Sequence, residues 1–250
     1  MNKRGKWQGM FTIARLNWPF YLVAAFVFIA AVGGLVVVSS PMLHWLCALA
    51  LAGAGYFLFG SLAVSFWIYD HSDLYRWGWL PRALGGNQFR RLIFCHSGFD
   101  ETSQALRERL TGEWVVLDHF NREQMTEPSI RRARVLYPPT PGTLPCSASK
   151  WPVEDHSAEI VFGLLAIHEL RSEAERTAWF REAARCLDQA GRVVLVEHPR
   201  DVANFVAFGP GFLHFHSPAS WRRCWEGAGL RKVDEFRITP CVRVFVLIAS

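Results

Sequence analysis

Two apolar runs are each followed in the sequence by polar residues whose side chains can act in acid–base catalysis. His168 and Glu169 follow the run Ala158–Leu165, and Glu197 follows the run Arg192–Val196. A histidine at such a place can act as a general base toward a hydroxyl or a thiol. We therefore take His168, Glu169 and Glu197 as candidate catalytic residues. The alternative is that they only orient a neighbouring loop or cap the next helix.

A second set of candidates surrounds a single glycine. Ser97 and Gly98 are small, and a glycine can adopt a left-handed turn that lets a ligand approach the backbone. Asp100 and Glu101 come next, and two carboxylates there would repel a phosphate but attract a sulfonium or ammonium group. The alternative is that Asp100 is an ordinary N-cap and Glu101 a first-turn acid.

Asp118 ends another apolar run, Glu113–Leu117, twenty residues after Gly98. A carboxylate at the end of a second strand can accept hydrogen bonds from both hydroxyls of a ribose. We expect Asp118 to bind the ribose of a nucleoside cofactor, with an ordinary surface acid as the alternative.

The elements that must position these residues are clearest between Ala158 and His198. Two runs rich in β-branched and aliphatic residues suit strands buried on both faces. Between them, apolar residues recur every three or four positions, as in an amphipathic helix. Ser172 and Glu175 form a capping box, and Gly191 is predicted to end the connection in a turn. Ligands of such a βαβ unit lie at the carboxyl ends of the strands.

Two uncharged segments, Pro19–Val38 and Trp45–Ile68, come earlier and are each long enough to cross roughly 30 Å of hydrocarbon. The link Ser39–His44 has no Lys or Arg. The flanking basic residues are Lys3, Arg4, Lys6, Arg15, Arg76, Arg82, Arg90 and Arg91. The positive-inside rule then predicts a two-pass hairpin in the cytoplasmic (inner) membrane, with both termini and the soluble domain cytoplasmic. Buried core helices and a cleaved signal peptide are the alternatives.

These patterns divide the 250-residue chain into residues 1–70 (terminal segment and hairpin), 71–90 (juxtamembrane linker) and 91–250 (soluble domain). We expect Tyr75, Trp77, Trp79 and Leu80 of the linker in the headgroup layer. The soluble domain is predicted to contain helices near 101–110 and 127–136, strands over 91–95 and 113–117, and an antiparallel pair over 231–238 and 242–248.

Composition excludes several functions. The six cysteines show no CxxC or zinc spacing, which is typical of reduced cytoplasmic thiols. The formal charge of +5 comes from dispersed basic residues and favours anionic lipid over nucleic acid. His198, His214 and His216 have no matching carboxylate or cysteine pattern, so no metal site is predicted. The aromatic segment 204–216 is either a lid over an apolar substrate or membrane-proximal packing.

The order of elements, the loop Lys150–Asp155 (KWPVED) and the segment Arg181–Glu197 resemble a class I S-adenosylmethionine-dependent methyltransferase of type 11. The resemblance spans about 91–250. It implies an α/β, Rossmann-like, seven-stranded and mostly parallel sheet with an antiparallel C-terminal strand pair, here preceded by two transmembrane helices.

The resemblance also implies S-adenosylmethionine as cofactor. The first loop of that family is glycine-rich, whereas here Gly98 alone remains. Ser147 takes the place from which an acid commonly meets the adenine amine. The candidate cofactor-binding residues are His96, Ser97, Gly98, Asp100, Asp118, Ser147 and Ala148.

The leading hypothesis is therefore a membrane-anchored methyltransferase acting on a small amphipathic or lipid-like acceptor. The second is a methyltransferase-like subunit of an integral-membrane complex that has lost catalysis. Small residues in the second apolar segment would allow close packing with such a partner. A dehydrogenase is disfavoured by the acids beside Gly98.

Overall fold

The computed structural model describes residues 4–250, so Lys3, used in the topology prediction, lies outside the described residues. Within that range, strands form one sheet in the order β3-β2-β1-β4-β5-β7-β6. Their bounds are β1 Arg91–His96, β2 Glu113–Asp118, β3 Thr143–Pro145, β4 Ala158–Leu164, β5 Leu187–Glu197, β6 Leu230–Thr239 and β7 Val242–Ala249. Strands β1 to β5 pair in parallel, and β7 runs antiparallel to both neighbours. The predicted fold class is confirmed.

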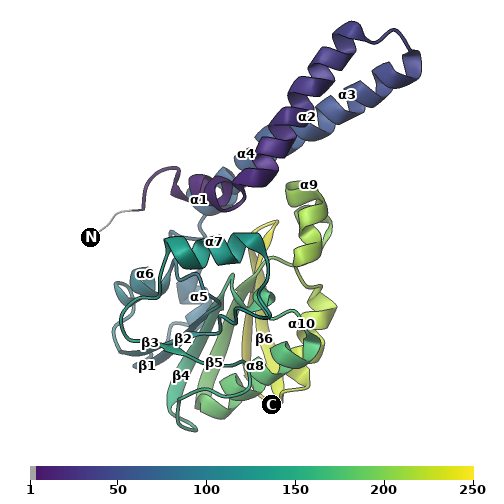
Figure 1. Ribbon diagram of the computed structural model, residues 1–250. Helices are drawn as coiled ribbons and strands as arrows, with labels where there is room; N and C mark the ends of the chain where they lie inside the picture. The colour runs from purple at the N-terminus through teal and green to yellow at the C-terminus, as the bar shows by residue number, and fades with distance from the viewer. Residues whose placement is uncertain (1–3) are drawn as a thin grey trace.

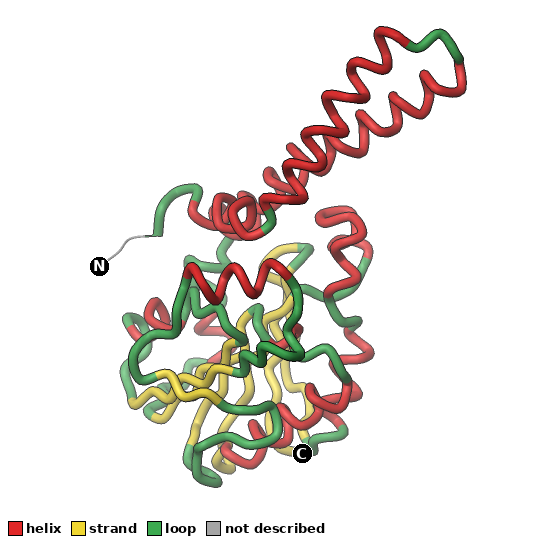
Figure 2. Tube along the Cα trace, viewed as in Figure 1, coloured by secondary structure: helices red, strands yellow, loops and turns green. Residues whose placement is uncertain are grey.

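Both faces of the sheet are covered (Figures 1 and 2). One face packs against α7 (Pro128–Leu136), α8 (Glu173–Cys186) and α10 (Pro218–Glu226) through an apolar core that includes Trp179, Phe180 and Trp221. The other face packs against α6 (Ser103–Arg107), α5 (Leu80–Leu84) and the chain that leads into α5. These layers hold the strand ends in fixed places.

The linker does not lie in a headgroup layer. Trp77, Trp79 and Leu80 are each only 5% exposed and pack in the apolar cluster on the β1–β4–β5 face. The indole nitrogen of Trp79 donates to the Leu74 carbonyl at 2.9 Å. The headgroup prediction was wrong, because these aromatic side chains cover a sheet face that only the short helices α5 and α6 would otherwise shield.

Two element boundaries also differ from the predictions. Helix α8 ends at Cys186 and β5 begins at once, so Gly191 lies inside the strand. The register against β4 shifts between Ala158 and Ile160, and a Cβ on Gly191 would lie 2.8 Å from the Leu187 side chain. Residues 188–191 lie between the pairs Ala158↔Leu187 and Ile160↔Arg192, so Gly191 belongs to an irregular stretch of β5. The predicted helix near 101–110 is reduced to α6.

The apolar segments form a hairpin that projects from the domain (Figure 1). Helix α2 covers Trp18–Val37, and a second continuous helix covers Pro41–His71. The second helix consists of α3 (Pro41–Gly55), a π-helical turn Tyr56–Gly60, α4 (Ser61–Phe66) and a π-helical turn Trp67–His71. Both are long and apolar enough to cross a membrane, and few of their residues are buried.

A short helix that the sequence patterns did not predict, α1 (Gln8–Leu16), lies across the base of the hairpin. The Asp70 carboxylate accepts hydrogen bonds from the backbone N–H groups of Gly9 at 2.7 Å and Met10 at 2.9 Å. An acid at a helix N-terminus pairs unsatisfied donors and complements the helix dipole. The Tyr69 hydroxyl bonds His198 Nε2 at 2.8 Å, which joins the hairpin to the end of β5.

Candidate functional site

The sheet order brings the predicted cofactor residues to one edge. His96 at the end of β1 pairs in register with Asp118 at the end of β2, which pairs with Pro145 of β3. Ser147 and Ala148 come two and three residues after the end of β3. The carboxyl ends of these three strands are where ligands of open α/β sheets bind.

Asp118 is buried and fully engaged within the chain. Its Oδ1 accepts hydrogen bonds from the backbone N–H groups of Gly98 at 2.9 Å and Phe120 at 3.0 Å. Its Oδ2 pairs with the Arg134 guanidinium from α7. In this arrangement Asp118 fixes the first loop against the second strand, and Arg134 covers its Oδ2.

The first loop has the left-handed turn that the sequence predicts. Gly98 has a φ of 86°, and a Cβ there would lie 2.6 Å from the Phe120 ring. Phe120 packs directly over the glycine, with the Arg134 guanidinium 5.0 Å from its ring centroid. Buried beside this turn, both His96 ring nitrogens and the Ser97 hydroxyl lack hydrogen-bond partners. His96 Nδ1 is 3.4 Å from Asp118 but is not directed at it, and burial lowers the pKa of His96.

The two acids after Gly98 are also paired within the chain. Asp100 accepts from the backbone N–H groups of Thr102 and Ser103, at 3.2 and 2.9 Å, and so holds the turn that leads into α6. Glu101 accepts from the Tyr75 hydroxyl at 2.7 Å and pairs with Arg4 at 2.6 Å. The N-cap residue of α6 is Thr102, so Asp100 is not the N-cap that the alternative expected. Both carboxylates have partners within the chain.

At the carboxyl ends of β1 to β3, some side chains could bind a nucleoside ligand and others fill the space that it would need. The unpaired atoms of His96 and Ser97 are buried polar groups that a ligand can satisfy. Phe120 and Arg134 fill the space above Gly98, and both are partly exposed, so rotation can clear it without unfolding the sheet. Ser147 is exposed, and Ala148 packs against the core.

The second cluster lies at the ends of β4 and β5. The Glu197 side chain is completely buried. Its Oε1 accepts from the backbone N–H groups of Ile167 at 2.8 Å and His168 at 3.1 Å, and its Oε2 lies 2.7 Å from His168 Nδ1. A carboxylate in this position fixes the orientation of the imidazole and leaves Nε2 directed away from Glu197.

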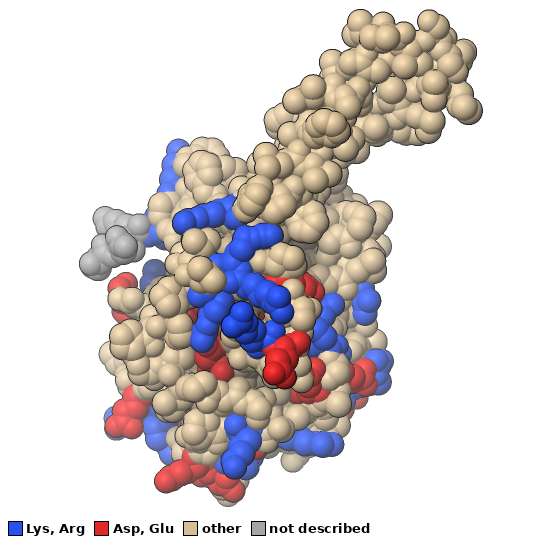
Figure 3. Space-filling view, viewed as in Figure 1, with Lys and Arg blue, Asp and Glu red and all other residues tan. Residues whose placement is uncertain are grey.

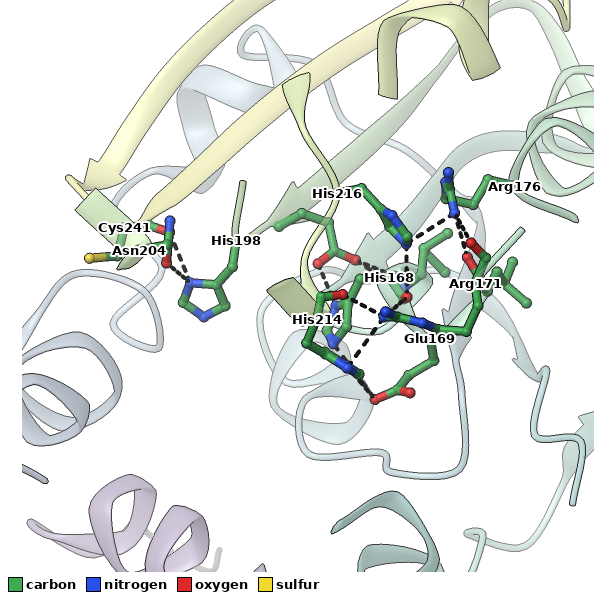
Figure 4. A network of polar contacts seen from close by, with 12 residues as sticks. His168, Glu169, Arg171, Arg176, His198, Asn204, His214, His216 and Cys241 are labelled. Atoms are coloured by element: carbon green, nitrogen blue, oxygen red, sulfur yellow. Dashed lines mark hydrogen bonds and ion pairs between the residues drawn. The ribbon is translucent and has the colours of Figure 1, made fainter. Parts of the chain in front are cut away.

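His168 and Glu169 belong to a 3₁₀ turn, Ile167–Glu169, and face a histidine from another turn, Gly209–His214 (Figure 4). Glu169 Oε1 lies 3.7 Å from His168 Nε2 and 3.4 Å from His214 Nε2. His214 Nδ1 lies 2.8 Å from the Glu127 carboxylate. Burial opposes charge on His214, but its hydrogen bonds to Glu127 and Glu169 raise its pKa to about 9.

The other histidines near these strand ends have structural partners. His216 Nε2 accepts from Arg176 at 3.0 Å, and burial together with Arg176 lowers its pKa to about 3. His198 lies apart from the cluster in Figure 4, with Nδ1 2.8 Å from the Cys241 carbonyl. Burial lowers the pKa of His198 to about 4. Both rings are neutral members of the core.

Known proteins share this architecture at low sequence identity. A protein from Pyrococcus horikoshii OT3 is 12% identical with a TM-score of 0.51, over 69% of this chain and 88% of its own. A methyltransferase in complex with the Haloferax volcanii Trm112 methyltransferase activator is 16% identical with a TM-score of 0.50, over 69% and 89%. No model of a protein family matches the chain, and no curated protein matches its sequence.

A third solved structure is geranyl diphosphate C-methyltransferase from Streptomyces coelicolor A3(2), in complex with Mg²⁺, geranyl diphosphate and S-adenosyl-L-homocysteine. It is 10% identical with a TM-score of 0.50, over 70% of this chain and 78% of its own. The chain has the class I methyltransferase fold.

Within this methyltransferase fold, sequence reasoning found His168, Glu169 and Glu197, which the structure brings together. It missed Glu127, which precedes α7, and it did not connect His214 with these residues. Glu127 lies about 40 residues before His168, and no local pattern marks it. His214 lies in a conspicuously aromatic segment, the one signal that could have drawn attention to it.

Proposed function

We propose that this protein is a membrane-anchored, S-adenosylmethionine-dependent methyltransferase acting on a small amphipathic or lipid-like acceptor. The observation that carries the proposal is the position of two polar clusters at one carboxyl edge of a methyltransferase-fold sheet. The base of the hairpin reaches the same edge through Tyr69 and His198. Donor, acceptor and membrane could therefore meet at one place.

Three surface features support membrane association. The hairpin is almost wholly unburied and shows no charged side chains on the face in Figure 3. Basic side chains gather below it over α7, which contains Arg131, Arg132 and Arg134. Helix α9 (Val202–Phe208) stands at the same end of the domain and exposes apolar side chains, including Val202 and Phe205. Apolar surface beside basic residues favours an anionic bilayer. The predicted orientation leaves the domain on the cytoplasmic side.

S-adenosylmethionine would supply a methyl group on its sulfonium. The His96, Ser97 and Gly98 turn and the Asp118 carboxylate are the groups that would hold its polar ends. The fold neighbour with bound geranyl diphosphate supports an isoprenoid-like acceptor class. His168 would meet that acceptor, and Glu197 fixes the orientation of its imidazole. Proximity and alignment would carry most of the rate, because methyl transfer requires in-line geometry.

Calorimetric titration of the full-length protein in detergent with S-adenosylmethionine tests the proposal. Wild type should bind, and Asp118→Ala should weaken binding by at least about tenfold, because hydrogen bonds to a charged group contribute about 1.5–3 kcal/mol. Asp188→Ala is the matched control, since that acid pairs with Arg91 at the opposite end of the sheet. Absence of binding by wild type would contradict the proposal.

A second candidate function is a non-catalytic subunit of an integral-membrane complex. It is favoured by the internal pairing of Asp118, Asp100 and Glu101. One fold neighbour is itself held in complex with an activator protein. Purification in mild detergent separates the two functions: a stoichiometric membrane partner without cofactor binding would favour the subunit.

A further inference from the structure

We propose that His168, Glu169 and His214 form a binding site for a divalent transition-metal ion of the zinc class. One ligand atom from each residue lies within 4.8 Å of the other two. The residues come from two separate turns, Ile167–Glu169 and Gly209–His214. The chain therefore folds to bring them together.

The distances suit a metal. Zinc binds imidazole nitrogen and carboxylate oxygen at about 2.0–2.2 Å, which places tetrahedral ligands about 3.3 Å apart. Glu169 Oε1 already lies 3.4 Å from His214 Nε2 and 3.7 Å from His168 Nε2. The three ligand atoms lie within 4.8 Å of one another, so an inward movement of the side chains would complete three bonds.

The surroundings of both histidines are those of metal ligands. A ligating imidazole usually donates its other N–H to a carboxylate, which fixes the tautomer and raises the basicity of the ligand. His168 Nδ1 bonds Glu197 at 2.7 Å, and His214 Nδ1 bonds Glu127 at 2.8 Å. Each ring is thus held by a separate carboxylate, with Nε2 turned toward Glu169 (Figure 4). A random surface group of acids and histidines would not show this pairing twice.

One positive charge lies close to the cluster. The Arg171 guanidinium donates to the His214 carbonyl oxygen and to the His168 carbonyl oxygen. Arg171 Nη1 lies 3.3 Å from His214 Nδ1, whereas the Glu127 carboxylate lies 2.8 Å from the same nitrogen. We therefore take Glu127 as the hydrogen-bond partner of His214 Nδ1. Arg171 ties the two turns together. Because the pKa of His214 is about 9, a metal would have to displace the proton on His214 Nε2.

Three protein ligands leave at least one coordination position open, as in catalytic rather than structural zinc sites. That position would be available to an oxygen of the acceptor, which the metal would polarise. The use of the metal in methyl transfer rests on the proposed function, but its binding does not.

The test is a Co²⁺ titration of chelator-treated, full-length protein purified with a tag that contains no histidine. Wild type should bind one Co²⁺ per chain with the visible absorption of a four- or five-coordinate ion. His168→Ala and His214→Ala should abolish that absorption. The control His44→Ala removes a histidine from α3 at the far end of the hairpin and should bind as wild type does.

Glu127→Gln and Glu169→Gln keep the shapes of their side chains and guard against loss of fold in the alanine variants. Loss of a carboxylate that supports a ligating histidine typically lowers metal affinity about 10–100-fold, so Glu127→Gln should lower Co²⁺ affinity by that factor. Glu169→Gln removes a proposed ligand and should lower Co²⁺ affinity by about 100-fold or more. Equal Co²⁺ binding by His214→Ala and His44→Ala would overturn the proposal, as would wild type without the absorption band. S-adenosylmethionine is absent from this titration, so its outcome is independent of the calorimetric test.

Discussion

The two halves of the carboxyl edge both contain buried or partly buried carboxylates, but these carboxylates have different kinds of partner. At the β1–β2 half, Asp118, Asp100 and Glu101 all direct their oxygens at partners within the chain. At the β4–β5 half, Glu197 and Glu127 each hold an imidazole by one nitrogen, and the other nitrogen stays directed at Glu169. The acids of the first half hold backbone N–H groups and side-chain donors, whereas Glu197 and Glu127 of the second half hold imidazole rings. Position at the carboxyl edge therefore does not decide a role; the partner of each carboxylate does.

The largest expected effect concerns Glu197, the carboxylate that builds the second half. Glu197→Ala leaves the buried N–H groups of Ile167 and His168 without a partner. At about 1–3 kcal/mol for each orphaned group, the free energy of unfolding should fall by about 3 kcal/mol or more, measured by denaturant titration in detergent. Glu169→Ala, which removes no backbone partner, should cost clearly less. Equal losses would mean that Glu197 does not organise the turn.

An intermediate effect concerns Gly98 in the first half. Gly98→Ala adds a left-handed alanine and a clash with Phe120, and we expect it to cost about 2 kcal/mol of stability. Gly86→Ala is the matched control, because Gly86 has a φ of 74° but no atom near its Cβ position. Gly86→Ala should lose only the stability that the strained backbone costs, without the cost of a clash.

The double variant Gly98→Ala/Phe120→Ala removes the clash while keeping the strain. Its loss of stability should be smaller than the sum of the two single losses. Additive losses would show that Phe120 does not press on the turn.

The smallest expected effect concerns Arg134, which covers Asp118. Arg134→Ala should tighten S-adenosylmethionine binding by about fivefold in calorimetry, since a partly exposed ion pair that must open contributes about 1 kcal/mol. Arg131→Ala, on the same helix but bonded to the Arg122 carbonyl, should leave affinity unchanged. Weaker binding by Arg134→Ala would instead make Arg134 part of the cofactor site.

The fold could be predicted because its signals are local and repeated. The buried runs that became β4 and β5, and the capping box Ser172–Glu175 that begins α8, each depend on residues within a few positions. The short strand β3 was missed because three residues in a proline-rich stretch, Thr143–Pro145, have too little pattern. The burial of Trp77 and Trp79 was missed because amphipathic aromatic residues suit a membrane interface and a sheet face equally.

The sequence could predict which residues follow each strand, but it could not predict which of those residues meet residues from other segments. His168 and Glu197 were found because each follows a buried run, and the topology then joined them. Glu127 and His214 meet through tertiary packing between segments 87 residues apart, which leaves no trace in spacing. The pairing of Asp118 with Arg134 was equally out of reach, because an acid at a strand end has the same sequence signature whether free or paired.

If the protein is the methyltransferase proposed above, the hydrogen bond between Tyr69 and His198 bears on how it would select an acceptor. It joins the last turn of the hairpin to the end of β5, and the Asp70 carboxylate holds α1 at the same junction. In a bilayer the domain would stand at a constant height, unable to rise or sink to follow its acceptor. A molecule would then be selected by the depth at which its reactive atom rests in the lipid, before any contact with His168 discriminates its shape.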